Sequence, residues 1–413
     1  MESCVNREER RALAKNKKVD KSKPARILWA SNAPWASTGY GTQTAQTTTR
    51  LKKHGHEVAI AALYGLEANS TNWNTPYGDI KIYPRGHETY SNDIVPAHMY
   101  DWSQEDPEAQ NLLITLFDVW VFRGDKWADW NVASWTPIDH MPAPPDVMKW
   151  SKQKFVTPIA MSQYGQKIFQ NSDVECLYVP HAIEPVFKPT NEITFNDETL
   201  TSRQLMGVAE DKFVVGMNAA NKGVMPNRKA FGENILAFSM FAQKHKDVVL
   251  YLHTEASGSL GGINLRDLIL SCGIPQDQVI FADPYLLRTG MPQEMLASIY
   301  TGMDVLLATS YGEGFGIPTV ESLACSTPVI VSNFAASAEL CGDGWLIGGQ
   351  PLWNAPQKAW FHLPSVPEIV DALEQAYNRG RVKSQKAIDF AKQYDADTVY
   401  ETHWKPALAK LLA

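Results

Sequence analysis

Cysteine is scarce in this sequence of 413 residues, and no two cysteines form a Cys-x-x-Cys pair. Structural zinc sites use closely spaced cysteines, and small secreted domains use an even, dense set of them. Neither pattern is present, because the five cysteines are scattered at Cys4, Cys176, Cys272, Cys325 and Cys341. We therefore expect reduced thiols and a cytoplasmic protein.

Long apolar runs are also missing. A helix that crosses a bilayer needs about 20 consecutive apolar residues, and no run approaches that length. The N-terminus is charged rather than apolar, which does not fit a secretory signal segment. Hydrophobic residues make up 44% of the chain and charged residues 20%, as in globular proteins. At this length we expect two domains of near-equal size.

Excess basic charge is confined to the start of the chain. The formal net charge is −7, but residues 1–26 carry nine basic and four acidic side chains, which leaves +5 there and −12 in the remainder. A basic arm over residues 1–25 could contact nucleic acid or an anionic membrane surface. A solvated leader is the more common role of such an arm. Its position ahead of the first strand makes it dispensable for the fold.

The most informative stretch is a glycine-rich loop. An apolar strand is expected at residues 304–309, and the loop after it contains Gly312, Gly314 and Gly316 ahead of a helix that opens at Pro318. Glycine permits positive φ and close approach of backbone N–H groups to a ligand, and proline suits the first turn of a helix. Free amides and the helix dipole favour an anion at this point. We expect the loop to bind a phosphate or a diphosphate.

Two carboxylates flank this loop. Glu313 lies within it and Glu321 lies about one turn into the helix, with seven residues between them. Ionised carboxylates accept hydrogen bonds from vicinal hydroxyls, so the pair suits a sugar ring and a ribose on either side of a diphosphate. The alternative is an ordinary strand-to-helix loop, because acidic residues are common near a helix start.

The run EGFGIPTVE, with PVIVSN at 328–333 and Glu339, resembles the E-x7-E signature of retaining GT-B glycosyltransferases of the family-four type (glycosyl transferases group 1). The resemblance continues in order along the chain, through TGYG at 38–41, TPIDHMPAPP at 136–145, YVPHAIEPVFKP at 178–189 and NRKAFGENILAF at 227–238. It implies an α/β GT-B fold, in which two Rossmann-like domains face a central cleft and a C-terminal helix crosses back to the first domain.

Strand and turn patterns indicate where the domains divide. A βαβ unit is expected from Arg26 onward, and a proline-containing segment without a periodic apolar face marks a boundary before a strand at 213–217. The expected divisions are an N-terminal domain at 26–183, a linker at 184–192, a C-terminal domain at 193–380 and helices at 381–413. The resemblance implies that the first domain lies on the acceptor side, that the second binds the nucleotide sugar and that the last helices return to the first domain.

Candidate residues follow strands of the first domain, at the edge where open α/β sheets bind ligands. Asp118 and Asp139 each end a predicted strand, although helix capping or a turn explains each of them about equally well. The resemblance implies that the loop of Gly39 and Gly41 reaches toward the sugar and the acceptor, with Asp118 on the acceptor side. It also implies a histidine near the acceptor, but Asp139 occupies that place beside His140, so the choice between the two stays open.

Cations gather after the first strand of the second domain. Lys222, Arg228 and Lys229 lie at its carboxyl end beside a predicted helix start. Positive charge there opposes the helix dipole, which indicates an anionic ligand. The resemblance implies an Arg and a Lys on the diphosphate; Lys229 matches the Lys, Asn221 occupies the Arg position, and Arg228 or Lys222 substitutes for the missing Arg. The other residues expected at the donor are Asp283, Tyr285, Gly314, Phe315 and Gly316.

The resemblance implies retaining transfer of a sugar from a UDP- or GDP-linked donor, with Glu313 on the transferred sugar and Glu321 on the ribose. Amides and cations would stabilise the departing phosphate, and no further cofactor is expected. No metal is expected either, because the Asp-Ala-Asp run at 395–397 lies between two predicted helices, where capping explains it better than chelation. The acceptor stays open among glycan, lipid carrier, small metabolite and modified DNA base. The alternatives are an epimerase of the same fold and a catalytically silent nucleotide-sugar-binding partner.

Overall fold

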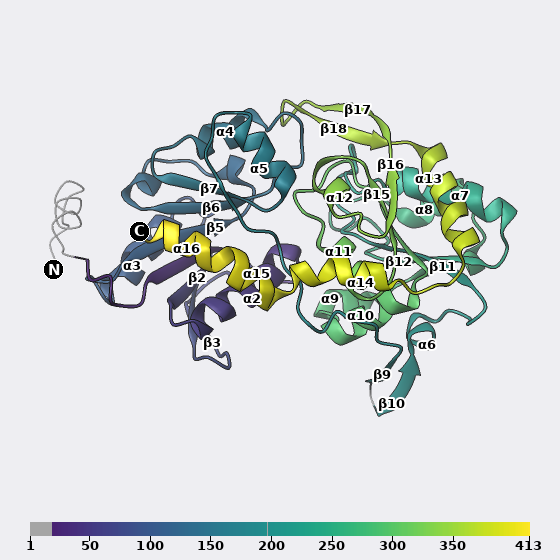
Figure 1. The fold of residues 1–413 in the computed structure, drawn as a ribbon, viewed down its shortest axis with the longest axis horizontal. Helices are drawn as coiled ribbons and strands as arrows, with labels where there is room; N and C mark the ends of the chain where they lie inside the picture. Colours follow the sequence, from purple (N-terminus) through teal and green to yellow (C-terminus); the bar gives the residue numbers. More distant parts are fainter. Residues whose placement is uncertain (1–18, 196) are drawn as a thin grey trace.

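Two mainly parallel sheets, each covered by helices, lie side by side in the computed structural model of the protein, which describes residues 19–195 and 197–413 (Figure 1). The N-terminal sheet is formed by strands between residues 26 and 178, and the C-terminal sheet by strands between residues 213 and 347. Most of the basic arm, residues 1–18, lies outside the described residues.

The N-terminal sheet has the strand order β3-β4-β2-β1-β5-β6-β7-β8, and every neighbouring pair is parallel except β3 with β4. Its central strand β1 (Arg26–Asn32) is buried throughout, because both faces of the sheet are covered. Successive side chains therefore serve two cores, with Ile27 and Trp29 on one face and Leu28 and Ala30 on the other. The other strands are β2 (Glu57–Tyr64), β3 (Thr71–Trp73), β4 (Ile80–Tyr83), β5 (Asn111–Leu116), β6 (Val132–Thr136), β7 (Val156–Ala160) and β8 (Leu177–Tyr178).

The helices of this half connect the parallel strands. Helix α2 (Gly39–Lys53) starts directly after Thr38, whose side chain accepts a hydrogen bond from the Gly41 amide and so caps the first turn. The remaining helices are α3 (Val95–Gln104), α4 (Pro145–Ser151), α5 (Gln163–Gln170) and the short η1 (Val119–Val121) and η2 (Lys126–Asp129). In the part of the chain that the structure describes, no helix combines the length and the apolar character needed to cross a membrane.

The C-terminal sheet has six strands in the order β13-β12-β11-β14-β15-β16, and all neighbouring pairs are parallel. The strands are β11 (Phe213–Asn218), β12 (Val248–His253), β13 (Val279–Phe281), β14 (Val305–Ala308), β15 (Val329–Ser332) and β16 (Gly344–Ile347). The helices around it are α6 (Ser202–Met206), α7 (Phe231–Lys244), α8 (Leu265–Ser271), η3 (Gln276–Gln278), α9 (Pro284–Thr289), α10 (Gln293–Gly302), α11 (Ile317–Ala324), α12 (Ala335–Glu339) and α13 (Val366–Arg379). The predicted βα alternation is thus present in both halves.

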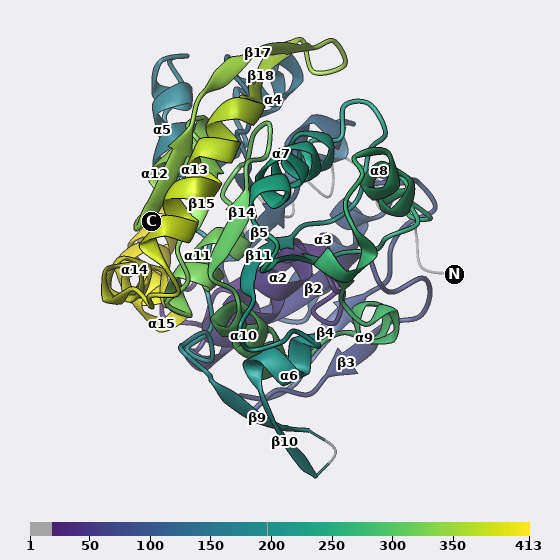
Figure 2. The same ribbon diagram turned by 90° about the vertical axis from the view of Figure 1, so that its right-hand side faces the viewer.

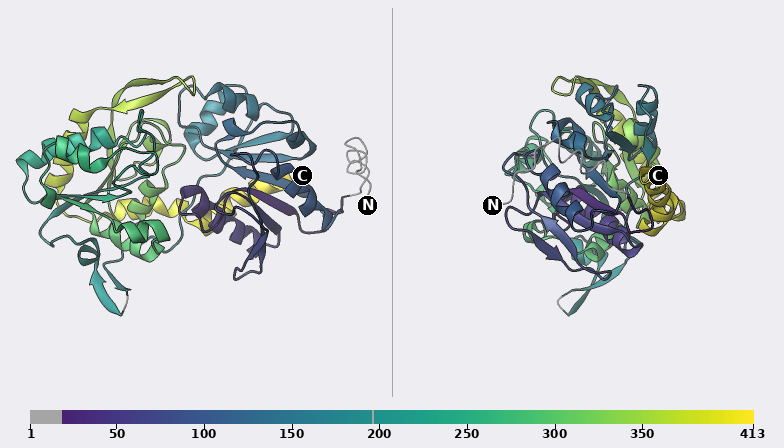
Figure 3. Two further views of the ribbon diagram at one scale, coloured as in Figure 1. Left: turned by 180° about the vertical axis from the view of Figure 1, so that it is seen from behind. Right: turned by 90° about the vertical axis from the view of Figure 1, so that its left-hand side faces the viewer.

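After α13 the chain runs back to the N-terminal sheet, as Figure 3 shows from behind. Trp404 packs its ring 5.7 Å from that of Trp29 and 4.9 Å from that of Trp135, which fixes the returning segment against the first core. Asp395 caps a helix there by accepting from the amides of Asp397 and Thr398, so the predicted capping role is confirmed. The elements of this segment are α14 (Gln385–Ala391), η4 (Lys392–Tyr394), α15 (Ala396–Val399), the π-helical η5 (Tyr400–Trp404) and α16 (Lys405–Leu411).

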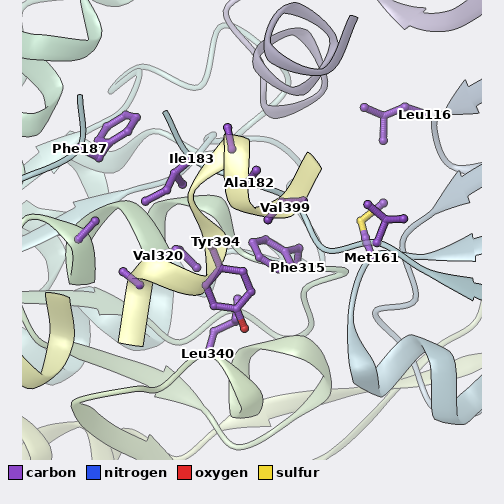
Figure 4. Close-up of a cluster of buried hydrophobic side chains, with 14 of the residues drawn as sticks. Leu116, Met161, Ala182, Ile183, Phe187, Phe315, Val320, Leu340, Tyr394 and Val399 are labelled. Atoms are coloured by element: carbon purple, nitrogen blue, oxygen red, sulfur yellow. The ribbon is translucent and has the colours of Figure 1, made fainter. Parts of the chain in front are cut away.

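One hydrophobic cluster joins the two halves and the linker (Figure 4). Phe315 from the glycine-rich loop is 2% exposed, and its ring lies 5.4 Å from those of His181 and Tyr394. Because this core draws on both sheets and the returning helices, separating the halves would expose apolar surface. Its labelled members are Leu116, Met161, Ala182, Ile183, Phe187, Phe315, Val320, Leu340, Tyr394 and Val399.

A β-hairpin extends from the C-terminal half toward α4 and α5 (Figures 1 and 2). It consists of β17 (Gly349–Asn354) and β18 (Ala359–Pro364), which pair antiparallel. The backbones of Trp360 and Met141 exchange two hydrogen bonds of 3.0 Å, so the hairpin is joined to the loop after β6. A second hairpin, β9 (Glu192–Phe195) with β10 (Glu198–Thr201), precedes α6.

Candidate active site

The carboxyl ends of strands from both sheets meet at one place. The glycine-rich loop after β14 lies against the loop after β6, so closely that a side chain on Gly312 or Gly314 would collide with it. A Cβ on Gly312 would lie 2.1 Å from the Asp139 carbonyl oxygen, and one on Gly314 would lie 2.2 Å from Pro137 Cβ. The candidate site is therefore built from both halves of the molecule.

This contact corrects the expected role of the glycines. Of the three, Gly316 alone has a positive φ, of +118°, and it directly precedes α11. Gly312 and Gly314 are needed because another backbone approaches them, not because of their own dihedral angles. Gly39 lies near the start of α11, where its Cβ would be 3.3 Å from Ile317 Cδ1. Gly41 is required by its own turn, since its Cβ would lie 2.2 Å from the Ala36 carbonyl oxygen.

Glu313 is held by two cations from the loop before α7. Lys229 Nζ lies 2.5 Å from Glu313 Oε1, and Arg228 Nη1 lies 3.0 Å from Glu313 Oε2 while also donating to the Gly312 carbonyl. Burial would raise the pKa of Glu313, but the charges of Lys229 and Arg228 lower it to about 2. Glu313 is thus an ionised carboxylate in a strongly polar setting.

Two other residues that were predicted to bind the diphosphate, Lys222 and Asn221, do not contact Glu313. Lys222 is exposed, so of the two proposed substitutes Arg228 is the one that the structure brings to the loop. Asn221 is buried, and its amide group bonds the backbones of Glu255 and Ile263 instead of facing the cations. It braces the loop after β11. Contact between its side chain and a diphosphate is therefore not supported by this geometry.

The acidic residues of the N-terminal half cluster opposite Arg228. Arg228 Nη1 lies 3.9 Å from Asp139 Oδ2, and His140 Nδ1 lies 2.6 Å from Asp139 Oδ1. Tyr40 donates a hydrogen bond of 3.3 Å to Asp118. Burial and the nearby Asp139 charge raise the pKa of Asp118 to about 6. Burial opposes ionisation of Asp139 as well, but the hydrogen bond from His140 and the charge of Arg228 lower its pKa.

Glu321 lies on the buried side of α11 and is 6% exposed. It accepts a hydrogen bond of 2.8 Å from Tyr300, whose hydroxyl in turn accepts one of 2.7 Å from Asn218 at the end of β11. Burial raises the pKa of Glu321 to about 7, against the opposing effect of the Tyr300 hydrogen bond. Glu321, about one turn into α11, therefore holds its proton far more strongly than Glu313 does.

Three further predictions can be compared with the structure. Phe315 was expected at the donor; its side chain is buried in the cluster that joins the two halves, so the ring contributes core packing, and a donor contact of this residue stays a prediction. Asp283 caps α9 by accepting from the amides of Tyr285 and Leu286. Tyr285 is 74% exposed, so its ring presents a free face beside the carboxyl end of β13.

Several polar groups near the site were not anticipated. Tyr300 bonds Glu321 from α10, and Asn354 of the β17–β18 hairpin bonds His140. At the carboxyl end of β12, His253 Nδ1 and Thr254 Oγ1 are buried without a hydrogen-bond partner among the described residues. For His253 and Thr254, their position at the end of a predicted strand could have identified them as candidates. Tyr300 and Asn354 gave no local signal.

Chemically, the arrangement places two cations and the N-terminus of α11 beside the loop. Amide groups and cations there suit an anion, while Glu313, Asp118 and Asp139 offer acceptors for hydroxyl groups. Within residues 19–195 and 197–413, no group of three His, Cys, Asp or Glu side chains has a geometry that would hold a metal ion.

The sequence of residues 216–377 matches the family "Glycosyl transferases group 1". Among curated proteins, D-inositol 3-phosphate glycosyltransferase of Paenarthrobacter aurescens is 28% identical over 227 residues, covering 51% of this chain and 48% of that protein. O-antigen chain mannosyltransferase B of Escherichia coli is 35% identical over 57 residues, covering 14% and 15% of the two chains. The chain thus spans about half the length, or less, of these curated relatives. The resemblance to group 1 glycosyltransferases is confirmed.

Solved structures share the fold over nearly the whole chain. Sucrose-phosphate synthase of Thermosynechococcus elongatus superposes with a TM-score of 0.66 at 14% identity, covering 94% of this chain and 99% of that one. Anabaena HepE in complex with UDP-glucose superposes with a TM-score of 0.61 at 14% identity, covering 93% and 99%. The fold is GT-B, as predicted.

Proposed function

We propose that this chain, whose residues 216–377 match the group 1 glycosyltransferases, transfers a sugar from a nucleoside diphosphate to an acceptor hydroxyl and retains the anomeric configuration. The observation that carries the proposal is the joint hold of Arg228 and Lys229 on Glu313, at the loop that precedes the N-terminus of α11. A diphosphate is the ligand that would use both cations and the helix amides together.

The same site would stabilise the leaving group of the proposed transfer. Negative charge develops on the phosphate oxygen as the sugar departs, and cations fixed in a partly buried site stabilise that charge more effectively than water does. Arg228 and Lys229 supply two positive charges here, so we propose that the transfer needs no metal ion. Retained activity in the presence of a chelator would support this, and restoration by added Mg²⁺ or Mn²⁺ would refute it.

The two glutamates of the site are assigned to different parts of the donor. Glu313, ionised beside the cations, is assigned to hydroxyls of the transferred sugar. Glu321, with Tyr300 and Asn218, is assigned to the ribose. Tyr285 offers an exposed ring for the nucleobase. The bound UDP-glucose in the HepE structure supports a nucleotide sugar as the partner in this fold.

The proposal is tested by incubating the protein with a panel of UDP- and GDP-linked sugars and measuring released nucleotide and product mass. We expect nucleoside diphosphate and a product heavier by one sugar residue, or free sugar when water is the acceptor. A changed sugar that stays attached to the nucleotide would indicate an epimerase. Donor that binds and is never consumed would indicate a silent partner.

Location and the basic arm stay predictions. The free thiols of Cys176, Cys272, Cys325 and Cys341 support a reducing, cytoplasmic setting. Contact of residues 1–26 with nucleic acid or an anionic membrane predicts activity toward such an acceptor that falls steeply with salt.

A further inference from the structure

We propose that Asp139, and not His140, is the member of this pair that contacts the acceptor hydroxyl, and that Asn354 is the positioning residue that orients it. This inference rests on the proposed function and goes beyond it, since it assigns a role to the β17–β18 hairpin. The hairpin belongs to the C-terminal half, yet it would complete the acceptor side of the site on the N-terminal sheet.

Both ring nitrogens of His140 are engaged within the protein. Nδ1 lies 2.6 Å from Asp139 Oδ1, and Nε2 lies 2.9 Å from Asn354 Nδ2. An amide nitrogen is a donor only, so His140 Nε2 accepts and the ring proton is on Nδ1, which donates to Asp139. The hydrogen bond at one nitrogen thereby fixes the tautomer at the other.

The hairpin also fixes the orientation of the ring. Phe361 stacks on His140 with ring centroids 3.8 Å apart, and the backbone pair of Met141 with Trp360 secures the neighbouring residue. The side chain of His140 is 5% exposed, whereas that of Asp139 is 23% exposed. Of the two, Asp139 is therefore the one that a ligand can reach.

The second oxygen of Asp139 points toward the proposed reaction centre. Oδ2 lies 3.9 Å from Arg228 Nη1, and the same guanidinium nitrogen lies 3.0 Å from Glu313 Oε2. A carboxylate at this place accepts a hydrogen bond from a hydroxyl and orients the hydroxyl oxygen for attack. The attacking hydroxyl forms the new bond to the anomeric carbon, the bond to the phosphate oxygen breaks, and the proton leaves with that oxygen.

Two matched substitutions separate the roles of the two nitrogens. His140→Asn places an N–H near the position of Nδ1, and His140→Gln places one near the position of Nε2. We expect turnover of His140→Gln to lie at least tenfold below that of His140→Asn, with donor KM similar in both. Equal turnover, or the reverse order, would overturn the assignment of Asp139.

Asn354→Leu tests the hairpin, with Gln350→Leu at an exposed position of the same hairpin as its control. We expect a fall of about tenfold in kcat for Asn354→Leu and an acid limb of the pH profile displaced to higher pH, because Asp139 loses a fixed donor. Besides His140 and Arg228, the titratable groups that influence Asp139, or that it influences, are Tyr40, Asp118, Tyr164, Lys229 and Glu313. If the pH profile and kcat of Asn354→Leu both equal those of the wild type, Asn354 does not position His140 and Asp139.

A readout independent of turnover keeps this inference separate from the proposed function. In protein labelled with ¹⁵N-histidine, NMR reports which nitrogen of His140 carries the proton, and His140→Asn identifies the signal. We expect the Nδ1–H form in the wild type and a mixture in Asn354→Leu. An Nε2–H form in the wild type overturns the inference, whatever the enzyme does. Failure of every donor in the panel, with the Nδ1–H form present, overturns the proposed function instead.

Discussion

Lys229 Nζ and Glu313 Oε1 lie 2.5 Å apart, in an ion pair between the loop before α7 and the loop before α11. Under the proposed function, a diphosphate bound here would compete with Glu313 for Lys229 and for Arg228. We therefore propose that donor binding releases the Glu313 carboxylate, which then becomes available to the sugar hydroxyls.

Glu313→Gln keeps the shape of the side chain and removes its charge. We expect turnover to fall by about 10²–10³-fold, because a group that acts in the transition state is weakened. Binding of UDP or GDP should stay equal or become tighter, since the cations lose a competitor. Kinetics and titration calorimetry measure both, with Glu374→Gln on α13, which pairs with Lys244 and His245 at the C-terminal end of α7, as the control. Weaker nucleotide binding at unchanged turnover would contradict the assignment.

Glu321 predicts a pH-dependent stability. Its pKa is near 7 in the folded protein and 4.5 ordinarily, so the folded state holds the proton more strongly than the unfolded state does. Its stabilising contribution is present below pH about 4.5 and is lost as the pH rises through 7. Relative to Glu321→Gln, we expect the wild type to lose about 2.5 kcal/mol in the free energy of unfolding between pH 5 and pH 8. Urea unfolding of both proteins at the two pH values measures this change. The expectation is contradicted if the wild type and Glu321→Gln differ in free energy of unfolding by the same amount at pH 5 and at pH 8.

Gly314→Ala is expected to disturb the contact between the two halves. The new Cβ would lie 2.2 Å from Pro137 Cβ, so the glycine-rich loop and the loop after β6 would have to move apart. Overpacking of this kind costs about 1–3 kcal/mol. We expect at least a tenfold loss of turnover, with faster hydrogen exchange in the loop after β6. Gly232→Ala in α7, where a Cβ meets nothing within 4 Å, is the control and should keep turnover.

Most strands of the two large sheets were predictable, because apolar runs bounded by Gly, Pro and Asp reflect local chain geometry. The β9–β10 and β17–β18 hairpins were not predicted. Asp139, Arg228, Lys229 and Glu313 were also candidates, since each follows a strand at the edge where such sheets bind ligands, but the choice between Arg228 and Lys222 and the choice between Asp139 and His140 stayed open. The structure brings these four together. The resemblance to one family ordered them along the chain, and the fold is the one it implied.

Other features depend on contacts between distant segments and left no local trace. Asn354 meets His140 across 214 residues of sequence. The need for glycine at 312 and 314 arises from the approach of residues 137–139. Phe315 was predicted at the donor together with Gly314 and Gly316, but adjacent side chains in a loop point in different directions, and this ring enters the core. Asn221 likewise turns inward to brace its own loop.

The most direct test of the central claim is calorimetric titration of UDP and GDP into the wild type and into a variant carrying Arg228→Met, Lys229→Met and Glu313→Gln. All three changes are made together, so that no buried carboxylate is left without its cations. We predict binding of UDP or GDP to the wild type and at least 100-fold weaker binding to the folded variant. Equal affinity of the two proteins would contradict the account, because the diphosphate would then bind elsewhere.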